Sequence, residues 1–141
     1  PTVLQATGAQ DDDIDRPGLS LASLIGGAGT DRGVVSEYHD GGSPVGMFML
    51  RTDKWKYNCY PGYPPELFDL TGDPDELCDL SQDPAYAQDL KRCHDKMCAL
   101  LDPAEANDLA FADQAQLIEQ LGGVEKIVNS EEFDHTPTHS G

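Results

Sequence analysis

The chain has 141 residues and a formal net charge of −17, from 26 acidic residues against 9 basic ones. A chain of this length is expected to form one domain that buries roughly two-thirds of its unfolded surface. The negative charge argues against nucleic acid and anionic membrane surfaces as partners, because both would repel it. No apolar run approaches the roughly 20 residues that a membrane-spanning helix needs.

Residues 1–33 are predicted to be a lead-in made of a helix and a loop. The helix starts with Pro1 in its first turn and stops at Gly8, and residues 19–25 of the loop favour one or two further helical turns. A helix pattern that is already under way at Pro1, with no Met before it, leads us to expect that the chain is part of a longer protein.

Residues 34–70 hold most of the aromatic residues and predict a small antiparallel sheet of about four strands, at 34–39, 45–51, 54–60 and 66–70. The second strand is apolar on both faces, which is typical of a central strand, and the prolines before the fourth place that strand at an edge. Alternation in the first strand puts Val35, Glu37 and His39 on one face.

Two helices are predicted after the sheet, because Asp83-Pro84 and Asp102-Pro103 each join an N-cap residue to a first-turn proline. The first helix runs to about Leu101 and the second to about Leu121. Their expected inner faces are Tyr86, Leu90, Cys93, Met97 and Leu100 in the first, and Leu109, Ala110, Leu117, Ile118 and Leu121 in the second.

The fold class is therefore predicted as α+β, a small antiparallel sheet with C-terminal helices packed on one face. The sheet-plus-helix unit covers 34–128, ending in a short helical turn, and 129–141 form a polar tail.

Cysteine usage predicts free thiols and no metal site. Cys59, Cys78, Cys93 and Cys98 form no CxxC pair and fit no zinc-finger spacing. Free, partly buried thiols favour a reducing compartment such as the cytoplasm. The run Asp11–Asp13 is interpreted as solvated, because three successive acids in a loop cannot all face one ion.

Several short motifs, in chain order, resemble one family. They are Ser36-Glu37-Tyr38-His39, Phe48-Met49-Leu50-Arg51, Trp55-Lys56-Tyr57, the run from Gly62 to Leu70, and Asp73-Pro74-Asp75-Glu76. Together they resemble the C-terminal region of a type I sulfatase, from the choline-sulfatase-like branch of the alkaline phosphatase superfamily. The run Pro64–Asp69 with Asp73-Pro74 is the most specific part. The resemblance implies a subdomain whose partner is a larger, catalytic α/β domain.

The resemblance also implies a cofactor chemistry that these residues do not supply. Sulfatases use formylglycine, made from Cys or Ser in a C/S-x-P/A-x-R motif, and a divalent cation, usually calcium. Cys59-Tyr60-Pro61 matches the first three positions, but Tyr63 stands where arginine is required, and the other cysteines fail at the third position. No catalytic residue and no metal ligand is therefore expected in the chain; calcium and formylglycine would belong to the complete enzyme.

One pair of residues is a candidate substrate-binding site. Glu37 and His39 share a face of the first strand and lead into the loop 40–44. We expect one of them to reach the substrate pocket, where a carboxylate would suit a cationic head group such as choline. The alternative is that both form hydrogen bonds at the interface between the two domains.

Two functions remain open. The first is the C-terminal subdomain of a sulfatase-family sulfuric ester hydrolase, which supports the catalytic domain and lines its substrate pocket. The second is a free-standing interaction module without catalytic activity. In either case the two-sided apolar second strand predicts an exposed apolar patch and a tendency to form homo-oligomers.

Overall fold

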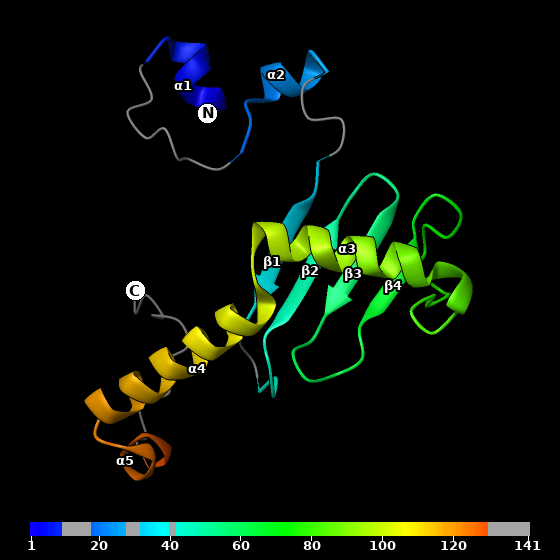
Figure 1. The fold of residues 1–141 in the computed structure, drawn as a ribbon. Coiled ribbons are helices and arrows are strands. Elements are labelled where there is room, and N and C mark those ends of the chain that lie inside the picture. The colour runs from blue at the N-terminus through cyan, green and yellow to red at the C-terminus, as the bar shows by residue number, and fades with distance from the viewer. Residues whose placement is uncertain (10–17, 28–31, 40–41, 130–141) are drawn as a thin grey trace, which may run out of the picture.

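A computed structural model describes residues 1–9, 18–27, 32–39 and 42–129. Its centre is a four-stranded antiparallel sheet whose strands lie side by side in chain order (Figure 1). The strands are β1 (Val34–Tyr38), β2 (Met47–Arg51), β3 (Trp55–Cys59) and β4 (Glu66–Asp69). Helices follow the sheet in the chain, so the predicted α+β class and four-stranded antiparallel sheet are confirmed.

The strand register builds the hydrophobic core on one face of the sheet. Val35 pairs with Leu50, Leu50 with Tyr57, and Tyr57 with Leu67. Directly opposite residues point to the same face, so these side chains form one row across all four strands. Leu50, Tyr57 and Leu67 are at most 2% exposed. The alternation of residues along each strand therefore determines which face of the sheet is covered by helix.

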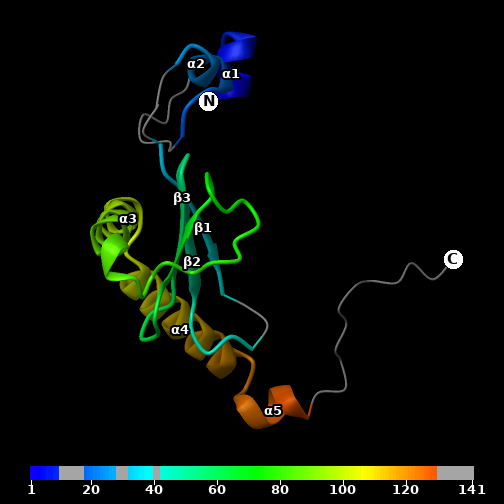
Figure 2. The ribbon, with the colours of Figure 1, turned by 90° about the vertical axis from the view of Figure 1, so that its right-hand side faces the viewer.

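Helix α3 (Ala87–Leu100) covers this face, and the edge-on view in Figure 2 shows it on one side of the sheet. The Asp83 carboxylate accepts a hydrogen bond from the Ala85 N–H and starts the preceding turn η1 (Pro84–Tyr86). Cys93 and Met97 are buried against the strands, as the sequence predicts. The prediction for Leu100 is wrong: it is 56% exposed, and the next residue packs on the core, because the backbone leaves the helix there in an extended conformation.

Helix α4 (Pro103–Gln120) is buried only near its start. The Asp102 carboxylate caps it by accepting from the N–H groups of Ala104 and Glu105, and Pro103 and Asn107 are buried. The inner face predicted for this helix is wrong for three of its five residues, since Leu109, Leu117 and Leu121 are 50–60% exposed, whereas Ala110 and Ile118 are half-buried. Figure 1 shows the reason: α4 runs away from the sheet, so its later turns have no strand beneath them. The short α5 (Val124–Val128) follows at its far end.

Two short helices precede the sheet, as predicted. Helix α1 (Thr2–Thr7) ends at Gly8, whose φ of 68° is the left-handed conformation that glycine favours, and α2 (Leu21–Ile25) begins at Ser20. The Leu21 N–H donates to Thr2 Oγ1 at 2.9 Å and joins the two helices.

Some sequence interpretations lie outside the described residues. They concern the acidic run at 11–13 and the polar tail from residue 130 onward. Within the described ranges, no helix combines the length and the apolar character needed to cross a membrane.

Candidate functional site

The structure brings the two predicted site residues together. Glu37 lies opposite Phe48 in the register, so its side chain is on the helix-covered face of the sheet. His39 follows the end of β1, and its Nε2 lies 3.2 Å from Glu37 Oε2. The His39 side chain is 25% exposed and that of Glu37 50% exposed. The two residues thus form a solvent-accessible carboxylate–imidazole pair at one end of the sheet.

The His39 ring is held in place by packing against Phe48 and Gly46. Its ring meets the edge of Phe48 at a centroid distance of 5.3 Å. A Cβ atom on Gly46 would come within 2.8 Å of both the His39 and Phe48 rings, so only glycine fits beneath them. Phe48 and Gly46 therefore fix the position of the imidazole.

The backbone of Gly46 is in turn fixed by helix α4. Its N–H donates to Asn107 Oδ1 at 2.8 Å, across 61 residues of sequence. Asn107 is 8% exposed. A buried amide that lost this partner would be costly, so the bond fastens the connection between β1 and β2 to the first turns of α4.

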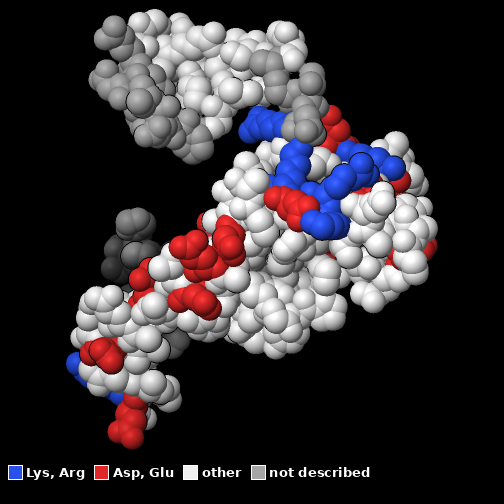
Figure 3. All heavy atoms as spheres, in the orientation of Figure 1, with Lys and Arg blue, Asp and Glu red and all other residues white. Residues whose placement is uncertain are grey.

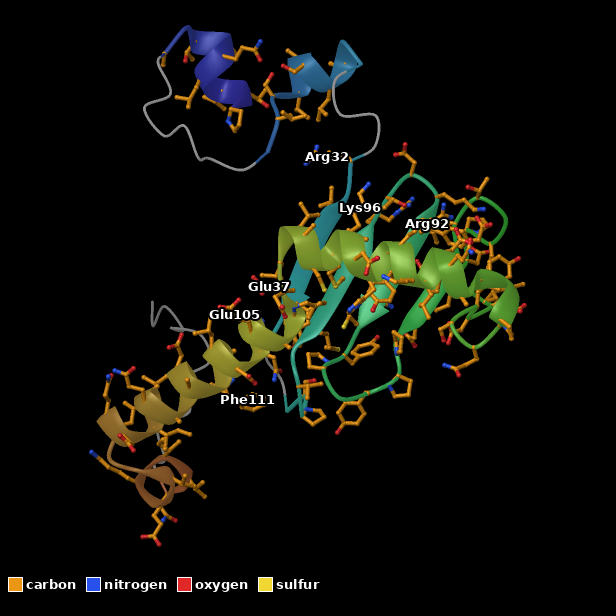
Figure 4. The ribbon with its side chains drawn as sticks, viewed as in Figure 1. Arg32, Glu37, Arg92, Lys96, Glu105 and Phe111 are labelled. Atoms are coloured by element: carbon orange, nitrogen blue, oxygen red, sulfur yellow. The ribbon has the colours of Figure 1, made fainter. Side chains whose placement is uncertain are left out.

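A small pocket opens beside His39, between the β1–β2 connection and α4. It has a volume of about 200 Å³ and its described lining residues are His39, Gly42, Ser43, Val45, Gly46, Asn107, Ala110, Phe111 and Gln114. Figure 4 shows Phe111 on the helix that forms one wall. Glu37 lies outside this lining. The polar side chains among these lining residues can donate and accept hydrogen bonds.

A larger cavity of about 640 Å³ lies between the 60–65 loop, one side of α3 and the start of α4. Inside it, Tyr57 Oη lies 3.0 Å from His94 Nδ1, and His94 Nε2 lies 3.6 Å from Cys98 Sγ. Burial raises the pKa of the Cys98 thiol, and the carboxylates of Asp102 and Asp95 raise it further. The thiol is therefore protonated at neutral pH and is poorly suited to act as a nucleophile.

The residues present do not fit the cofactors that the sequence resemblance implies. In the part of the chain that the structure describes, no three His, Cys, Asp or Glu side chains are grouped so that they could hold a metal ion. Cys59, the nearest match to a formylglycine motif, is the last residue of β3, and burial raises its pKa. Among the described residues, no reaction step can be assigned to either group.

Surface charge is unevenly distributed (Figure 3). Basic side chains, including Arg32, Arg92 and Lys96, gather over α3 and the adjacent strand ends, whereas acidic side chains cover α4. Several of the basic groups pair with acids nearby, such as Lys91 Nζ with Asp95 Oδ2 at 2.6 Å. Such exposed pairs contribute little energy.

Sequence reasoning missed the residues that complete both cavities. Asn107 and Gln114 could not be identified as site residues from the sequence. Both stand among helix-forming residues, and the residues they face lie on the β1–β2 connection, far away in the chain. His94 and Cys98 are four apart, a spacing that places both on one helix face and could have marked the pair.

No family model matches the chain. A 43-residue stretch, 28% of the chain, is 47% identical to arylsulfatase K from Gallus gallus, of which it covers 8%.

Solved structures match more of the chain. A candidate sulfatase from Bacteroides thetaiotaomicron is 29% identical with a TM-score of 0.61, and the match covers 77% of this chain and 24% of that one. A 2-O GAG sulfatase is 28% identical with a TM-score of 0.60, over 75% of this chain and 25% of that one. A phosphonate monoester hydrolase from Agrobacterium radiobacter shares the fold alone, at 22% identity, a TM-score of 0.54, and 71% and 23% coverage.

The chain thus spans about a quarter of the length of the solved structures that it matches. It resembles a part of the sulfatase-family hydrolases, within the alkaline phosphatase superfamily.

Proposed function

We propose that the chain is the C-terminal subdomain of a sulfatase-family sulfuric ester hydrolase, where it supports the catalytic domain and lines the substrate pocket with Glu37 and His39. The observation that carries this proposal is the Glu37–His39 pair, which is held by Phe48, Gly46 and Asn107 yet remains open to solvent. Likeness to a quarter of two sulfatase structures supports the family assignment. An accessible, rigidly mounted polar pair is what a substrate-contacting element requires.

The face of the sheet opposite α3 offers a surface for the catalytic domain. On its β4 side, Glu76 forms an ion pair with Lys56. On its β1 side, Tyr38 is 48% exposed, and Met47 and Met49 line a depression of about 250 Å³. Exposed methionine and tyrosine side chains are common where two protein surfaces meet. The catalytic domain is the proposed occupant.

The same surface would serve a free-standing interaction module, the second candidate. The upstream reading frame separates the two: a C/S-x-P/A-x-R motif some hundreds of codons before Pro1 favours the hydrolase subdomain. A start codon immediately before Pro1 favours the module.

The purified 141-residue chain is expected to show no turnover of an aryl sulfate or of choline sulfate at any protein concentration. The reason is that none of its cysteines satisfies the formylglycine motif. Released sulfate and phenol are measured, with a longer protein that includes the catalytic domain as the positive control. Activity that co-purifies with the chain would refute the proposal.

Glu37→Gln, made in a protein that includes the catalytic domain, is expected to raise KM about tenfold, the effect of losing one charge-assisted contact. kcat should change less, because a contact made equally in the ground and transition states affects only binding. The measurement uses choline sulfate, the substrate expected for the choline-sulfatase-like branch, and a neutral sugar sulfate. Glu125→Gln on α5 is the matched control. A KM that Glu37→Gln leaves unchanged for both esters would contradict the assignment of Glu37 to the substrate pocket.

A further inference from the structure

We propose that the outer edge of β1 pairs with β1 of a second copy of this chain, so that one antiparallel sheet runs through both copies. β1 is the first strand in the sheet order and β4 the last, so these two strands form the edges of the sheet (Figure 1). An edge strand carries main-chain N–H and C=O groups that no neighbouring strand satisfies. The inference does not rest on the hydrolase function proposed above.

The alternation of hydrogen bonds across the sheet shows which main-chain groups of β1 face outward. In the β2–β3 turn, the Thr52 N–H donates to the Trp55 carbonyl at 2.9 Å, so these two residues form a hydrogen-bonded pair. Hydrogen-bonded and non-hydrogen-bonded pairs alternate along an antiparallel ladder, so every second residue counted back from Thr52 turns its main-chain groups toward β3. Met49 lies between such residues and therefore turns its groups toward β1, where it pairs with Ser36.

Val35 and Glu37, on either side of Ser36, consequently turn their N–H and C=O groups away from the sheet. Among the residues that the structure describes, none forms a hydrogen bond with these outward-facing groups. The described part of the chain thus leaves a row of donors and acceptors unused along β1.

The opposite edge of the sheet is closed by the chain itself. In β4 the Leu67 N–H donates to Asp79 Oδ1 at 3.0 Å, and the Leu67 carbonyl accepts from the Leu80 N–H at 2.8 Å. The Asp69 carbonyl accepts from the Asp73 N–H at 2.7 Å. The segment after β4 therefore takes the place of a neighbouring strand, and β1 has no equivalent among the described residues.

The sequence of β1 favours strand pairing. It reads Val-Val-Ser-Glu-Tyr, with β-branched and aromatic residues and without the proline or lysine that commonly protects an edge strand. Val34 and Tyr38, on the face opposite α3, are 46% and 48% exposed. A second strand beside β1 would cover part of both side chains.

A pairing centred on Ser36 makes β1 complementary to itself. A two-fold axis at Ser36 places Val35 opposite Glu37 of the second copy, and these outward-facing residues can exchange main-chain hydrogen bonds. It also places Val34 opposite Tyr38 of the second copy, a β-branched and aromatic pair of the kind that stabilises antiparallel sheets. An axis at Glu37 would instead set two carboxylates directly opposite each other, which is unfavourable. The register centred on Ser36 is therefore the one expected.

Salt dependence distinguishes this contact from other ways in which two copies could meet. Each copy carries a formal charge of −17, so the copies repel each other. Added salt screens this repulsion, because the Debye length falls from about 10 Å at 0.1 M to about 3 Å at 1 M. Pairing along β1 is therefore expected to tighten as NaCl is raised. A contact between the basic surface over α3 and the acidic surface of α4 (Figure 3) would weaken instead, and that result would overturn the proposal.

Two charge variants at Ser36 test the pairing in the 141-residue chain. Ser36 is exposed, and the proposed axis brings the two Ser36 side chains together in a non-hydrogen-bonded pair, where side chains are closest. Ser36→Glu and Ser36→Lys each set like charges opposite each other and should raise the dimer Kd about tenfold or more, measured by sedimentation equilibrium. An equimolar mixture of the two variants sets opposite charges together and should restore Kd to within about threefold of that of the unmodified chain.

Thr71→Glu and Thr71→Lys, at an exposed turn position after β4, are the matched controls, because they change the net charge equally without touching β1. They should leave Kd within about twofold. A chain that stays monomeric at every protein and salt concentration overturns the proposal. So does a dimer that the Ser36 variants do not weaken, which would place the contact on another surface, such as the open face of the sheet. Weakening in both variants without rescue in the mixture would exclude the axis at Ser36.

Amide hydrogen exchange in the unmodified chain gives a second test that needs no variant. The Val35 and Glu37 amides are expected to exchange quickly in dilute solution and to become protected as the dimer forms. The Ser36 amide, which faces Met49 across the ladder, should stay protected throughout and serves as the internal control. Protection of Val35 and Glu37 that is already present in the monomer would show that another part of the same chain occupies the edge, and a second copy would then be excluded.

Discussion

Met97→Ala is expected to lower the free energy of unfolding of the chain by about 2–5 kcal/mol. Met97 is fully buried on α3 and packs on the row formed by Leu50, Tyr57 and Leu67. Removing its side chain leaves a cavity between α3 and the sheet, and the interior there can collapse only partly. Urea denaturation followed by circular dichroism measures the change.

Leu100→Ala provides the matched control for Met97→Ala. It removes an apolar side chain of similar size from the same helix, but Leu100 is 56% exposed. Its expected effect is within about 0.5 kcal/mol. Equal losses in the two variants would mean that α3 is rotated relative to the sheet from the orientation described above.

The second large effect concerns pH. Burial raises the pKa of the Cys93 thiol from 9.0 to about 11, and the nearby Asp89 carboxylate adds to the increase. The unfolded chain therefore releases this proton at lower pH than the folded chain. The resulting stability is fully present below pH 9 and is lost as the pH rises through 11. The expected loss is about 3 kcal/mol, from roughly 1.4 kcal/mol for each unit of pKa difference.

Cys93→Ala isolates this contribution. The variant is less stable at neutral pH because it loses packing, but its stability should fall less steeply between pH 9 and pH 11 than that of the wild type. Denaturation curves recorded in the presence of a reductant at pH 7, 9, 10 and 11 give the two slopes. Parallel slopes would show that Cys93 does not titrate in this range.

The sheet could be predicted from the sequence because its determinants are local. Alternation along each strand, the turn residues and the proline break before β4 all act within a few residues. The same holds for the helix starts at Asp83 and Asp102, whose carboxylates cap the helices that follow them. The buried face of α3 follows from one stripe of apolar residues in the sequence. Only the last residue of that stripe, Leu100, was predicted wrongly.

Helix α4 shows where such reasoning fails. Its apolar residues recur as they would in a buried helix, but whether a surface lies beneath them depends on the direction in which α4 leaves α3. The candidate site shows the same limit. The position of Glu37 and His39 on one face was predictable, but the support from Gly46 and Asn107 links residues 61 apart and appears only in three dimensions.

The strand order has a kinetic consequence. Since every strand pairs with its neighbour in the chain and α3 packs back on β3, native contacts close short stretches of polypeptide. A mixed α/β unit with such connections is expected to fold at rates between those of helical bundles and of all-β sandwiches. A translating ribosome adds about 5–20 residues per second, so residues 34–101 can acquire their tertiary structure soon after they emerge.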